Sequence, residues 1–391
     1  MCPIDSASSA DAEIFTDEHR MFRETARRFI AKEIEPHARA WEKTEIGYPV
    51  ELWRKAADAG LVGIAIPPEY GGTGADMLFK IVLAEEMGRS IAGASTGATV
   101  FSADLMTTLL VRYGTEEQKQ RYFPGIMTGH VLMCAAITEP GAGSDVGALA
   151  SRARRDGADY LISGQKTFIS NGMHANLCLY VARTDADVEQ GKGAMSMFLL
   201  DMEAPGFQRQ RMDTMGERAG SVAELFLDNV RVPAAAMLGR EGMALRENLA
   251  DLFMTDRVSI GLRALATAQL AFDLTVDYVK SRTAFGKRIF DFQNTQFKLA
   301  EMKADLLVGH SFRDSLLRAL KNGTVDSLQA SVAKLWLCEM EFRIAHECLQ
   351  LHGGYGYIMD TPIARIFTYS RLETIYGGTS EIQKGTIARY I

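Results

Sequence analysis

The spacing of apolar residues changes twice along this chain and divides it into three zones. In the first zone, residues 1–130, apolar positions such as Phe22, Ala26 and Phe29 recur at the three- and four-residue spacing of a helix. Thr16 and Asp17 precede this run and carry side chains that cap helix N-termini. The pattern predicts an N-terminal helical domain over residues 1–130.

The second zone, residues 131–235, has the shorter period that is typical of β-strands. Five β-prone runs alternate with turn signals that contain glycine, and these runs are 160–162, 166–170, 177–182, 195–200 and 224–232. The spacing predicts a central β-barrel or a small sandwich. The polar segment 185–193 is expected to be a solvated loop between two strands.

The third zone, residues 236–391, returns to long helical runs. Two apolar faces are expected, one made by Leu262, Leu265, Ala266 and Leu270 and the other by Phe297, Leu299, Met302 and Leu306. The predicted fold class is therefore α+β and multidomain: an N-terminal helical domain, a central β-barrel and a C-terminal helical bundle.

Composition narrows the function classes. Hydrophobic residues make up 47% of the 391 residues and charged residues 24%, which are ordinary values for a globular protein. The net charge of −6 gives no field that would hold nucleic acid or an anionic membrane. The sequence has no uncharged apolar run long enough to span a membrane, so no membrane span is expected. The five cysteines are scattered, which predicts free thiols. A cytoplasmic protein is expected.

Residues 137–145, ITEPGAGSD, form the first stretch with candidate chemistry. Its glycines let backbone N–H groups approach a flat or anionic ligand. The hydroxyl groups of Thr138 and Ser144 can donate to the carbonyls of a ring. A tight turn that leaves a strand has the same composition, so both readings stay open for this stretch alone.

Residues 282–289, RTAFGKRI, with Gln293 beyond them, form the second stretch. Its cations could clamp a pyrophosphate, and the ring of Phe285 could pack beneath an adenine. A solvated helix end with a turn at Gly286 is the alternative.

Two glycine-rich stretches lie near the C-terminus. Residues 350–356, QLHGGYG, allow close backbone contact with a cofactor, but they also suit a plain helix C-cap, and His352 alone is typical of a structural histidine. In residues 376–382, YGGTSEI, the N–H groups at a helix start suit an anion or a developing oxyanion. Ser380 and Gln383 have the spacing of a capping box.

Together, in this order, the four stretches make the whole chain from residue 15 to residue 391 resemble the acyl-CoA dehydrogenase family. Residues 166–172, KTFISNG, and 215–218, MGER, add to the resemblance. It implies two helical domains that flank a β-barrel, FAD as the cofactor, and assembly as a homotetramer or homodimer.

The resemblance also implies which residues hold FAD. The isoalloxazine would lie against Ala135, Ile137, Thr138, Gly143, Ser144, Phe168, Ile169 and Ser170, between the barrel and the C-terminal helices. The pyrophosphate and adenosine would meet Arg282, Phe285 and Gln293, with Gln350, Gly353 and Gly354 of the adjacent subunit. Thr379 and Glu381 would contact the same FAD.

The chemistry that the resemblance implies is α,β-dehydrogenation of an acyl-CoA thioester. A carboxylate removes the α-proton, a β-hydride goes to flavin N5, and the electrons pass to an electron-transfer flavoprotein. The thioester oxygen needs hydrogen bonds as negative charge builds on it. The backbone N–H of Gly377 is implied as one donor.

Gly377 stands where many members of the family carry the catalytic glutamate. In the long-chain and isovaleryl branches, a glutamate just before an arginine on the first long C-terminal helix acts instead. The corresponding pair here is Asp256-Arg257, so Asp256 is the implied base. Its carboxyl is expected to fall roughly 1.3–1.5 Å short of a glutamate at fixed backbone, and a dry pocket would raise its pKa.

Other readings of the site stay open. Asp256 could form an ordinary surface pair with Arg257, and Glu247, Asp251 or Glu381 could serve as the base. Implied substrate contacts are Ser144, Arg257, Tyr376, Gly377 and Arg389. The glycine at 377 predicts extra volume for a long, branched or cyclic acyl group. Alternative functions are a diverged flavin oxidase or desaturase, and a catalytically silent flavin- or CoA-binding protein.

Overall fold

The computed structural model describes residues 9–184 and 194–391, and the loop predicted at 185–193 lies outside the described residues. The chain packs as two units that each combine distant segments. The first unit comprises Met1–Pro36, Met77–Gly97 and Asp256–Ile391. The second comprises His37–Asp76 and Ala98–Thr255. The division of the sequence at residues 130 and 235 stays a prediction.

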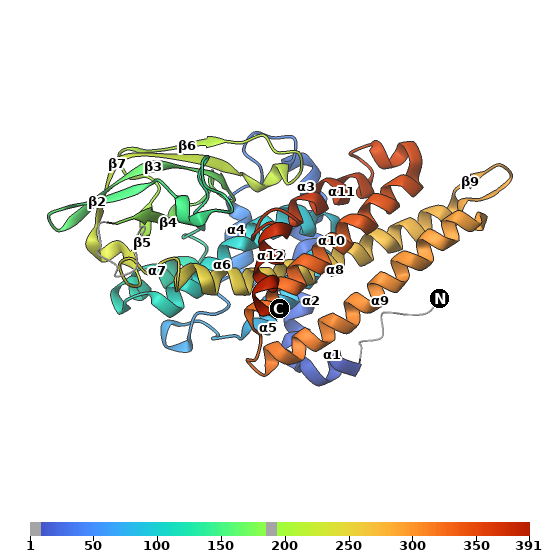
Figure 1. Ribbon diagram of the computed structural model, residues 1–391, viewed down its shortest axis with the longest axis horizontal. Helices are drawn as coiled ribbons and strands as arrows, with labels where there is room; N and C mark the ends of the chain where they lie inside the picture. The colour runs from blue at the N-terminus through green and yellow to red at the C-terminus, as the bar shows by residue number, and fades with distance from the viewer. Residues whose placement is uncertain (1–8, 185–193) are drawn as a thin grey trace. The chain divides into compact units, whose positions relative to one another are not determined.

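The first unit is helical. Its α-helices are α1 (Ser9–Ile14), α2 (Asp17–Phe29), α5 (Met77–Gly88), α9 (Gln293–Lys321), α10 (Ser327–His352), α11 (Pro362–Glu373) and α12 (Ser380–Ile387), with π-turns at Ile30–Ile34 and Gly93–Gly97. α10 packs against α9, α11 and α12 (Figure 1). A short hairpin, β9 (Thr283–Ala284) and β10 (Lys287–Arg288), precedes α9.

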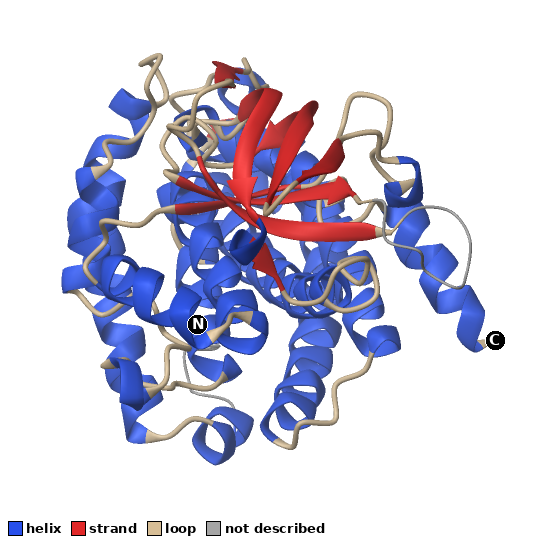
Figure 2. Cartoon of the chain, turned by 90° about the vertical axis from the view of Figure 1, so that its left-hand side faces the viewer, coloured by secondary structure: helices blue, strands red, loops and turns tan. Residues whose placement is uncertain are grey.

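The second unit contains the sheet (Figure 2). Its α-helices are α4 (Glu51–Asp58), α6 (Ala98–Tyr113) and α7 (Glu116–Met127), and its strands are β1 (Met133–Ala136), β2 (Arg152–Asp156), β3 (Asp159–Ile169), β4 (Leu177–Arg183), β5 (Met195–Asp201), β6 (Phe207–Arg211), β7 (Ala223–Pro233) and β8 (Met237–Leu238). Two α-helices have residues in both units, α3 (Glu35–Trp41) and α8 (Asn248–Ser281).

The strands form one mixed sheet in the order β6-β7-β3-β2-β4-β5-β8, and β1 pairs with β4. β3 and β7 are the long antiparallel pair, while β1 runs parallel to β4. β4 and β5 are buried on both faces except at their ends, which explains their nearly continuous apolar sequence. The β-prone runs predicted from the sequence coincide with strands of this sheet except at residue 170, which lies just after β3. The runs 160–162 and 166–170 belong to the single strand β3, so the turn expected between them was wrong, and a bulge stands there instead.

The helix starts follow the expected capping chemistry. Thr16 is the N-cap of α2 and forms a capping box with His19. Thr115 with Gln118 starts α7 in the same way. Side-chain caps satisfy backbone N–H groups that have no partner inside the helix, so these residues set the helix boundaries. The N-cap predicted at Thr16 is confirmed.

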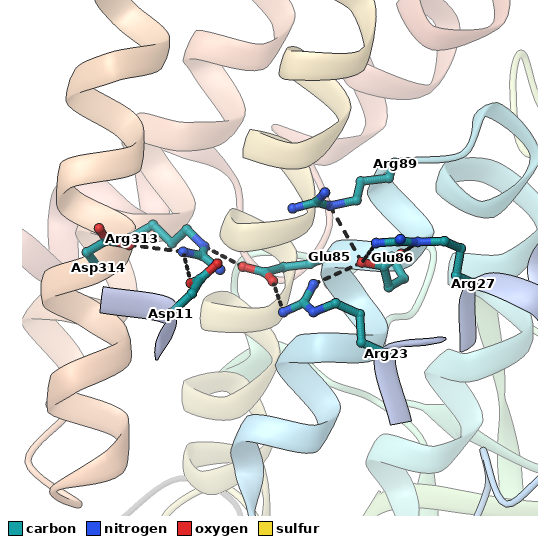
Figure 3. Close-up of polar contacts among 8 residues, drawn as sticks. All are labelled: Asp11, Arg23, Arg27, Glu85, Glu86, Arg89, Arg313 and Asp314. Carbon is teal, nitrogen blue, oxygen red and sulfur yellow. Dashed lines mark hydrogen bonds and ion pairs between the residues drawn. The ribbon is translucent and has the colours of Figure 1, made fainter. Parts of the chain in front are cut away.

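A network of buried charges connects α1, α2, α5 and α9 in the first unit (Figure 3). Glu85 on α5 accepts from Arg23 at 2.8 Å and from Arg313 at 2.5 Å. Its neighbour Glu86 accepts from Arg23 and Arg27, both at 2.9 Å. Because both carboxylates are buried, this pairing is needed for the helices to pack here.

Several expectations about individual residues can now be judged. Leu299, Met302 and Leu306 are buried on α9, but Phe297 is 58% exposed, so its assignment to that apolar face was wrong. The register of α9 turns position 297 away from the packed side. The four cysteines in the described residues are buried free thiols, as predicted, and these are Cys134, Cys178, Cys338 and Cys348.

Within the described residues, one helical stretch, Gly93–Tyr113, is long and apolar enough to cross a membrane by length and composition. Most of its apolar window, 78%, is buried inside the protein. That burial is typical of a core helix of a folded protein.

Candidate active site

The central feature of the site is the approach of α8 to the loop that precedes α12; the part of α8 from Asp256 onward and this loop both lie in the first unit. Gly377 in this loop has a left-handed backbone with φ +65°. A Cβ atom on Gly377 would lie 3.3 Å from Asp256 Oδ2 and 2.7 Å from Ile260 Cδ1. The Asp256 carboxyl therefore lies where a side chain of residue 377 would begin.

Ile260 occupies the space that a Cβ on Gly377 would need. The extra volume for an acyl group stays a prediction. Glycine at 377 is explained by this close approach together with the left-handed backbone. The Asp256 carboxyl comes to the loop from α8, so the shorter side chain is accommodated by the position of the helix.

Two side chains hold the loop by its carbonyl groups. Lys334 on α10 donates to the Gly378 carbonyl at 2.8 Å. Gln383 on α12 donates to the carbonyls of Gly377 at 3.1 Å and Gly378 at 2.9 Å. Lys334 and Gln383 are both buried, so these contacts fix the backbone of the loop and the direction of its N–H groups.

The capping box predicted from Ser380 and Gln383 was wrong by one residue. Thr379 is the N-cap of α12 and accepts from the N–H of Ile382. Ser380 donates to Glu339 at 2.5 Å, and Gln383 turns back to the glycine loop. Both side chains that local spacing would have assigned to the cap form hydrogen bonds with α10 or with the glycine loop instead.

Asp256 is half-buried, which argues against an ordinary surface pair with Arg257. Among the described residues, none donates a hydrogen bond to its carboxyl. Loss of hydration raises the pKa of Asp256 to about 6. Glu373 acts in the same direction, while the cations Arg263, Lys334 and Arg257 oppose the shift.

The other candidate bases are engaged elsewhere. Asp251 pairs with Arg112 at 2.8 Å and accepts from the hydroxyl of Tyr113. Glu247 pairs with Arg240. Glu247 and Asp251 lie in an open cavity of about 660 Å³ in the second unit. The cavity is lined by Arg112, Tyr113, Gly239, Arg240, Arg246, Glu247 and Asp251. Glu381 is exposed at the start of α12.

The second unit carries the glycine-rich stretch 137–145 after β1 and Phe168 near the end of β3. Phe168 has a left-handed backbone with φ 61°, which is uncommon for an aromatic residue, and its ring is 64% exposed. The N–H of Thr167 donates to the Thr138 carbonyl at 2.9 Å, so Phe168 lies next to this stretch. No atom lies within 4 Å of a Cβ placed on Gly141 or Gly143.

A buried ion pair anchors this stretch. Lys166 donates to Glu139 at 2.8 Å and to the Ile137 carbonyl at 2.9 Å. Glu139 in turn accepts from the backbone N–H groups of Ala150 and Ser151. The base of the stretch is therefore rigid, while Gly143 and Ser144 at its tip are exposed.

The predicted nucleotide-binding residues lie at one end of the first unit (Figure 1). Phe285 at the tip of the hairpin is 94% exposed. The guanidinium of Arg282 lies 6.0 Å from the ring centroid of Tyr355. Gln293 begins α9, and Gln350 is exposed in the last turn of α10. A Cβ on Gly353 or Gly354 would meet no atom within 4 Å.

These surfaces fit the two ends of FAD. An exposed aromatic ring beside an open glycine stretch suits a flat ring system, and cations with aromatic rings at an open glycine turn suit a pyrophosphate and adenine. Ala135 lies in β1, and Ile137 and Thr138 directly follow that strand; Ile169 is buried at the end of β3, and Ser170 follows it. Thr379 caps α12. Arg389 is exposed in the last turn of the chain. His352 is structural, buried, and stacked on Tyr278.

Family models decide the relationship. The models of the N-terminal, middle and C-terminal domains of acyl-CoA dehydrogenases match residues 16–130, 134–230 and 233–391. The chain belongs to the acyl-CoA dehydrogenase family. Enzymes of this family use FAD, so FAD is the cofactor and the protein is an oxidoreductase.

Three relatives illustrate the family. The mitochondrial long-chain specific acyl-CoA dehydrogenase of Mus musculus is 39% identical over 97% of this chain and 87% of its own length. The 3-(aryl)acrylate reductase of Clostridium sporogenes is 35% identical over 96% of this chain and 98% of its own. A crystal structure of an acyl-CoA dehydrogenase from Geobacillus kaustophilus has a TM-score of 0.91 and 38% identity, covering 96% and 98% of the two chains.

Sequence reasoning missed three further residues near Asp256. Arg263 on α8 and Glu373 at the end of α11 form a buried ion pair, and Lys334 holds the Gly378 carbonyl. One signal was available for Arg263: it follows Asp256 by seven residues, which is two helical turns, and interrupts an otherwise apolar run. Glu373 is brought to it only by tertiary packing.

Proposed function

We propose that this chain catalyses the FAD-dependent α,β-dehydrogenation of an acyl-CoA thioester, with Asp256 as the base that removes the α-proton. The observation that carries this proposal is the 3.3 Å separation between Asp256 Oδ2 and the Cβ position of residue 377. A glutamate in that position would project from the same point. Asp256 brings a carboxylate there from α8, so the base is supplied by the helix and the loop needs no acidic side chain.

The charge state of Asp256 supports this role. A base must be largely ionised at the working pH and still bind a proton well. A pKa of about 6 satisfies both conditions near neutral pH. The carboxyl has no hydrogen-bond donor among the described residues, so its lone pairs are available to a substrate proton.

The loop supplies the second part of the proposed site. Negative charge grows on the thioester oxygen as the α-proton leaves, and a fixed backbone N–H stabilises it without reorganisation. Gly377 offers such an N–H in a loop that Lys334 and Gln383 hold by its carbonyls. Bound FAD supplies the acceptor for the β-hydride.

The substrate and partners are proposed by similarity. A long-chain acyl-CoA is the first choice, because the mouse relative named for that substrate is 39% identical. An electron-transfer flavoprotein is the proposed electron acceptor. A homotetramer or homodimer is proposed because the first unit exposes large aromatic side chains, such as Phe285 at 94% and Tyr357 at 88% exposure. A second subunit would bury these side chains. A cytoplasmic location stays a prediction.

An anaerobic panel of acyl-CoA thioesters tests the proposal. Straight-chain substrates of short, medium and long length and a branched one are mixed with the holoenzyme, and loss of the yellow flavin absorbance is followed. We expect Asp256→Asn to slow this reduction by about 10²- to 10⁴-fold, the usual contribution of a general base. The matched control is Asp251→Asn on the same helix. A native rate in Asp256→Asn contradicts the base assignment.

Two additions to the panel separate the alternatives. The 3-(aryl)acrylate reductase relative is named for the opposite direction, so reduced enzyme is also mixed with α,β-unsaturated acyl-CoA thioesters. Rapid reoxidation of the reduced enzyme by air would favour an oxidase. Absence of flavin reduction by every substrate would favour a silent binding protein, which is the reading that membership of an enzyme family supports least.

A further inference from the structure

Arg263 lies on the same face of α8 as Asp256. Asp256, Ile260 and Arg263 are four and three residues apart, so their side chains follow one another along one side of the helix. Ile260 contacts the position beside Gly377. Arg263 contacts Tyr376, the residue before Gly377. The loop 376–378 therefore runs along the side of α8 that carries the proposed base.

The guanidinium of Arg263 is bound on two sides. Its Nη2 donates to Glu373 Oε1 at 3.0 Å, and its Nε donates to the same oxygen at 3.2 Å. Nη2 also donates to the hydroxyl oxygen of Tyr376. The side chains of Arg263 and Glu373 are 8% and 0% exposed, so the pair is a buried one.

Tyr376 is fixed at both ends of its side chain. Its ring packs on the cluster of Ile260, Ala264 and Cys338. Its hydroxyl donates to Glu373 Oε2 at 3.0 Å while it accepts from Arg263. Apolar packing sets the position of the ring, and the directional hydrogen bonds remove its remaining freedom to slide along α8. The backbone of Gly377 follows directly.

A buried ion pair is weak evidence for stability, because apolar residues of similar size often replace one without loss. What the pair does provide is a defined geometry, since the planar guanidinium of arginine donates its hydrogen bonds only in fixed directions. Here the partners are the end of α11 and the loop that offers the Gly377 N–H. The ion pair thus joins three chain segments at one point next to Asp256.

We propose that Arg263 and Glu373 are positioning residues for α-proton transfer, which through Tyr376 hold the Gly377 N–H in register with the Asp256 carboxyl. This inference rests on the proposed function. It assigns the pair no contact with the substrate. Proton transfer requires the thioester oxygen to reach the Gly377 N–H while the α-carbon reaches the Asp256 carboxyl. Misplacement of either group by about 1 Å can lower a rate about 100-fold.

The same pair also sets the charge around Asp256. The groups that face this carboxyl are Arg257 and Arg263 from α8, Lys334 from α10 and Glu373 from α11. Glu341 and Cys338 on α10 are also buried nearby, and burial followed by the charge of Glu373 raises the pKa of both well above the usual range. Glu373 is thus the negative neighbour of Asp256 whose removal has a predictable sign.

Exchange of the α-proton with solvent tests the inference without hydride transfer. The probe is 3-thiaoctanoyl-CoA, in which sulfur replaces the β-methylene, so no β-hydride can leave. The holoenzyme and probe are incubated in D2O over a range of pH, and deuterium at the α-carbon is measured by mass spectrometry. Two quantities are read out: the exchange rate, and the pH of its acid limb, which is the pH below which the rate falls because Asp256 becomes protonated.

Three variants separate position from charge. Tyr376→Phe removes the tether and leaves all charges, so exchange is expected to slow about 10- to 100-fold with an unchanged acid limb. Glu373→Gln slows exchange and also moves the limb downward by roughly one pH unit, because a negative neighbour is lost. The double variant Arg263→Met with Glu373→Gln removes both charges, so its exchange is slow and its limb stays near that of the wild type.

The control is Arg343→Met, which removes an exposed arginine that contacts Asp305 at 3.2 Å, and it is expected to exchange at the native rate. Thermal unfolding verifies that each variant is folded, and Tyr376→Phe keeps the test decisive if the double variant is not. Native exchange in a folded Tyr376→Phe, or an unmoved limb in Glu373→Gln, overturns the inference. If Asp256→Asn alone abolishes exchange in that case, the proposed function stands without it; native exchange in Asp256→Asn overturns both.

Discussion

Two carboxylates in the first unit, the buried Glu85 and the half-buried Asp256, have opposite surroundings. Glu85 accepts hydrogen bonds from Arg23 and Arg313 (Figure 3), whereas no described residue donates one to Asp256. Burial raises the pKa of both groups, but the two arginines lower that of Glu85 to about 2. Desolvation prevails at Asp256, whose pKa rises to about 6.

The difference shows what separates a structural acid from a reactive one. With a pKa of about 2, Glu85 is ionised near neutral pH and its oxygens accept hydrogen bonds from arginines, so it holds helices together and is a poor base. Asp256 keeps cations such as Arg263 and Lys334 within electrostatic range, but without a direct hydrogen bond. Partial compensation of charge leaves a carboxylate that is ionised at neutral pH and still basic.

The largest expected effect is on stability at Glu85. Glu85→Gln removes the buried carboxylate that Arg23 and Arg313 share and leaves them only their other partners, and the loss of one member of a buried ion pair costs up to about 3–5 kcal/mol. Urea unfolding should give a correspondingly lower free energy of unfolding. The control is Asp17→Asn, which breaks the exposed pair with Arg20 and should cost less than about 1 kcal/mol. Equal losses at the two positions would contradict the structural role of Glu85.

The pH dependence of flavin reduction should identify the reactive acid. Because the Asp256 carboxyl must be ionised to act, the rate constant should fall about tenfold per pH unit below a pKa of about 6 and level off above it. Stopped-flow measurement from pH 5 to 9 would locate this limb. A limb near the ordinary aspartate value, about 4, would contradict the raised pKa.

Gly377→Ala probes the close approach of α8 to the loop. A left-handed alanine costs about 1–2 kcal/mol, and its Cβ would meet Ile260 Cδ1 at 2.7 Å. We expect lower stability and slower flavin reduction. Adding Ile260→Val removes Cδ1 and should restore part of both losses. Gly385→Ala, in α12 with open space around it, is the matched control and should be neutral or stabilising.

The smallest expected effect has the opposite sign to that at Glu85. Because folding raises the pKa of Asp256 from 3.8 to about 6, its contribution to stability is fully present below pH 3.8 and is lost as pH rises through 6. Asp256→Asn should therefore unfold at a slightly higher temperature than the wild type at pH 8, but not at pH 4. Glu85, with a lowered pKa, loses its contribution only as pH falls from 4.5 towards 2.

The sequence by itself determined the order of the elements and the family. Helix starts at Thr16 and strands such as 177–182 could be predicted because caps and period-two patterns are local properties of the chain. The vacant position at Gly377 and the Asp256-Arg257 pair could also be read from it. Several family residues for FAD, such as Phe168 and Phe285, are exposed, whereas Ile169 is buried, and the contacts of all of them with FAD stay predictions.

Only the tertiary structure decided where the Asp256 carboxyl lies. Its distance to the Gly377 position depends on the packing of α8 against a loop more than one hundred residues away in the chain. The same packing places Ile260 beside Gly377 and gives Ser380 and Gln383 partners other than the predicted cap. Long-range contacts leave no local pattern in the sequence, because each partner's environment is created only when distant helices meet.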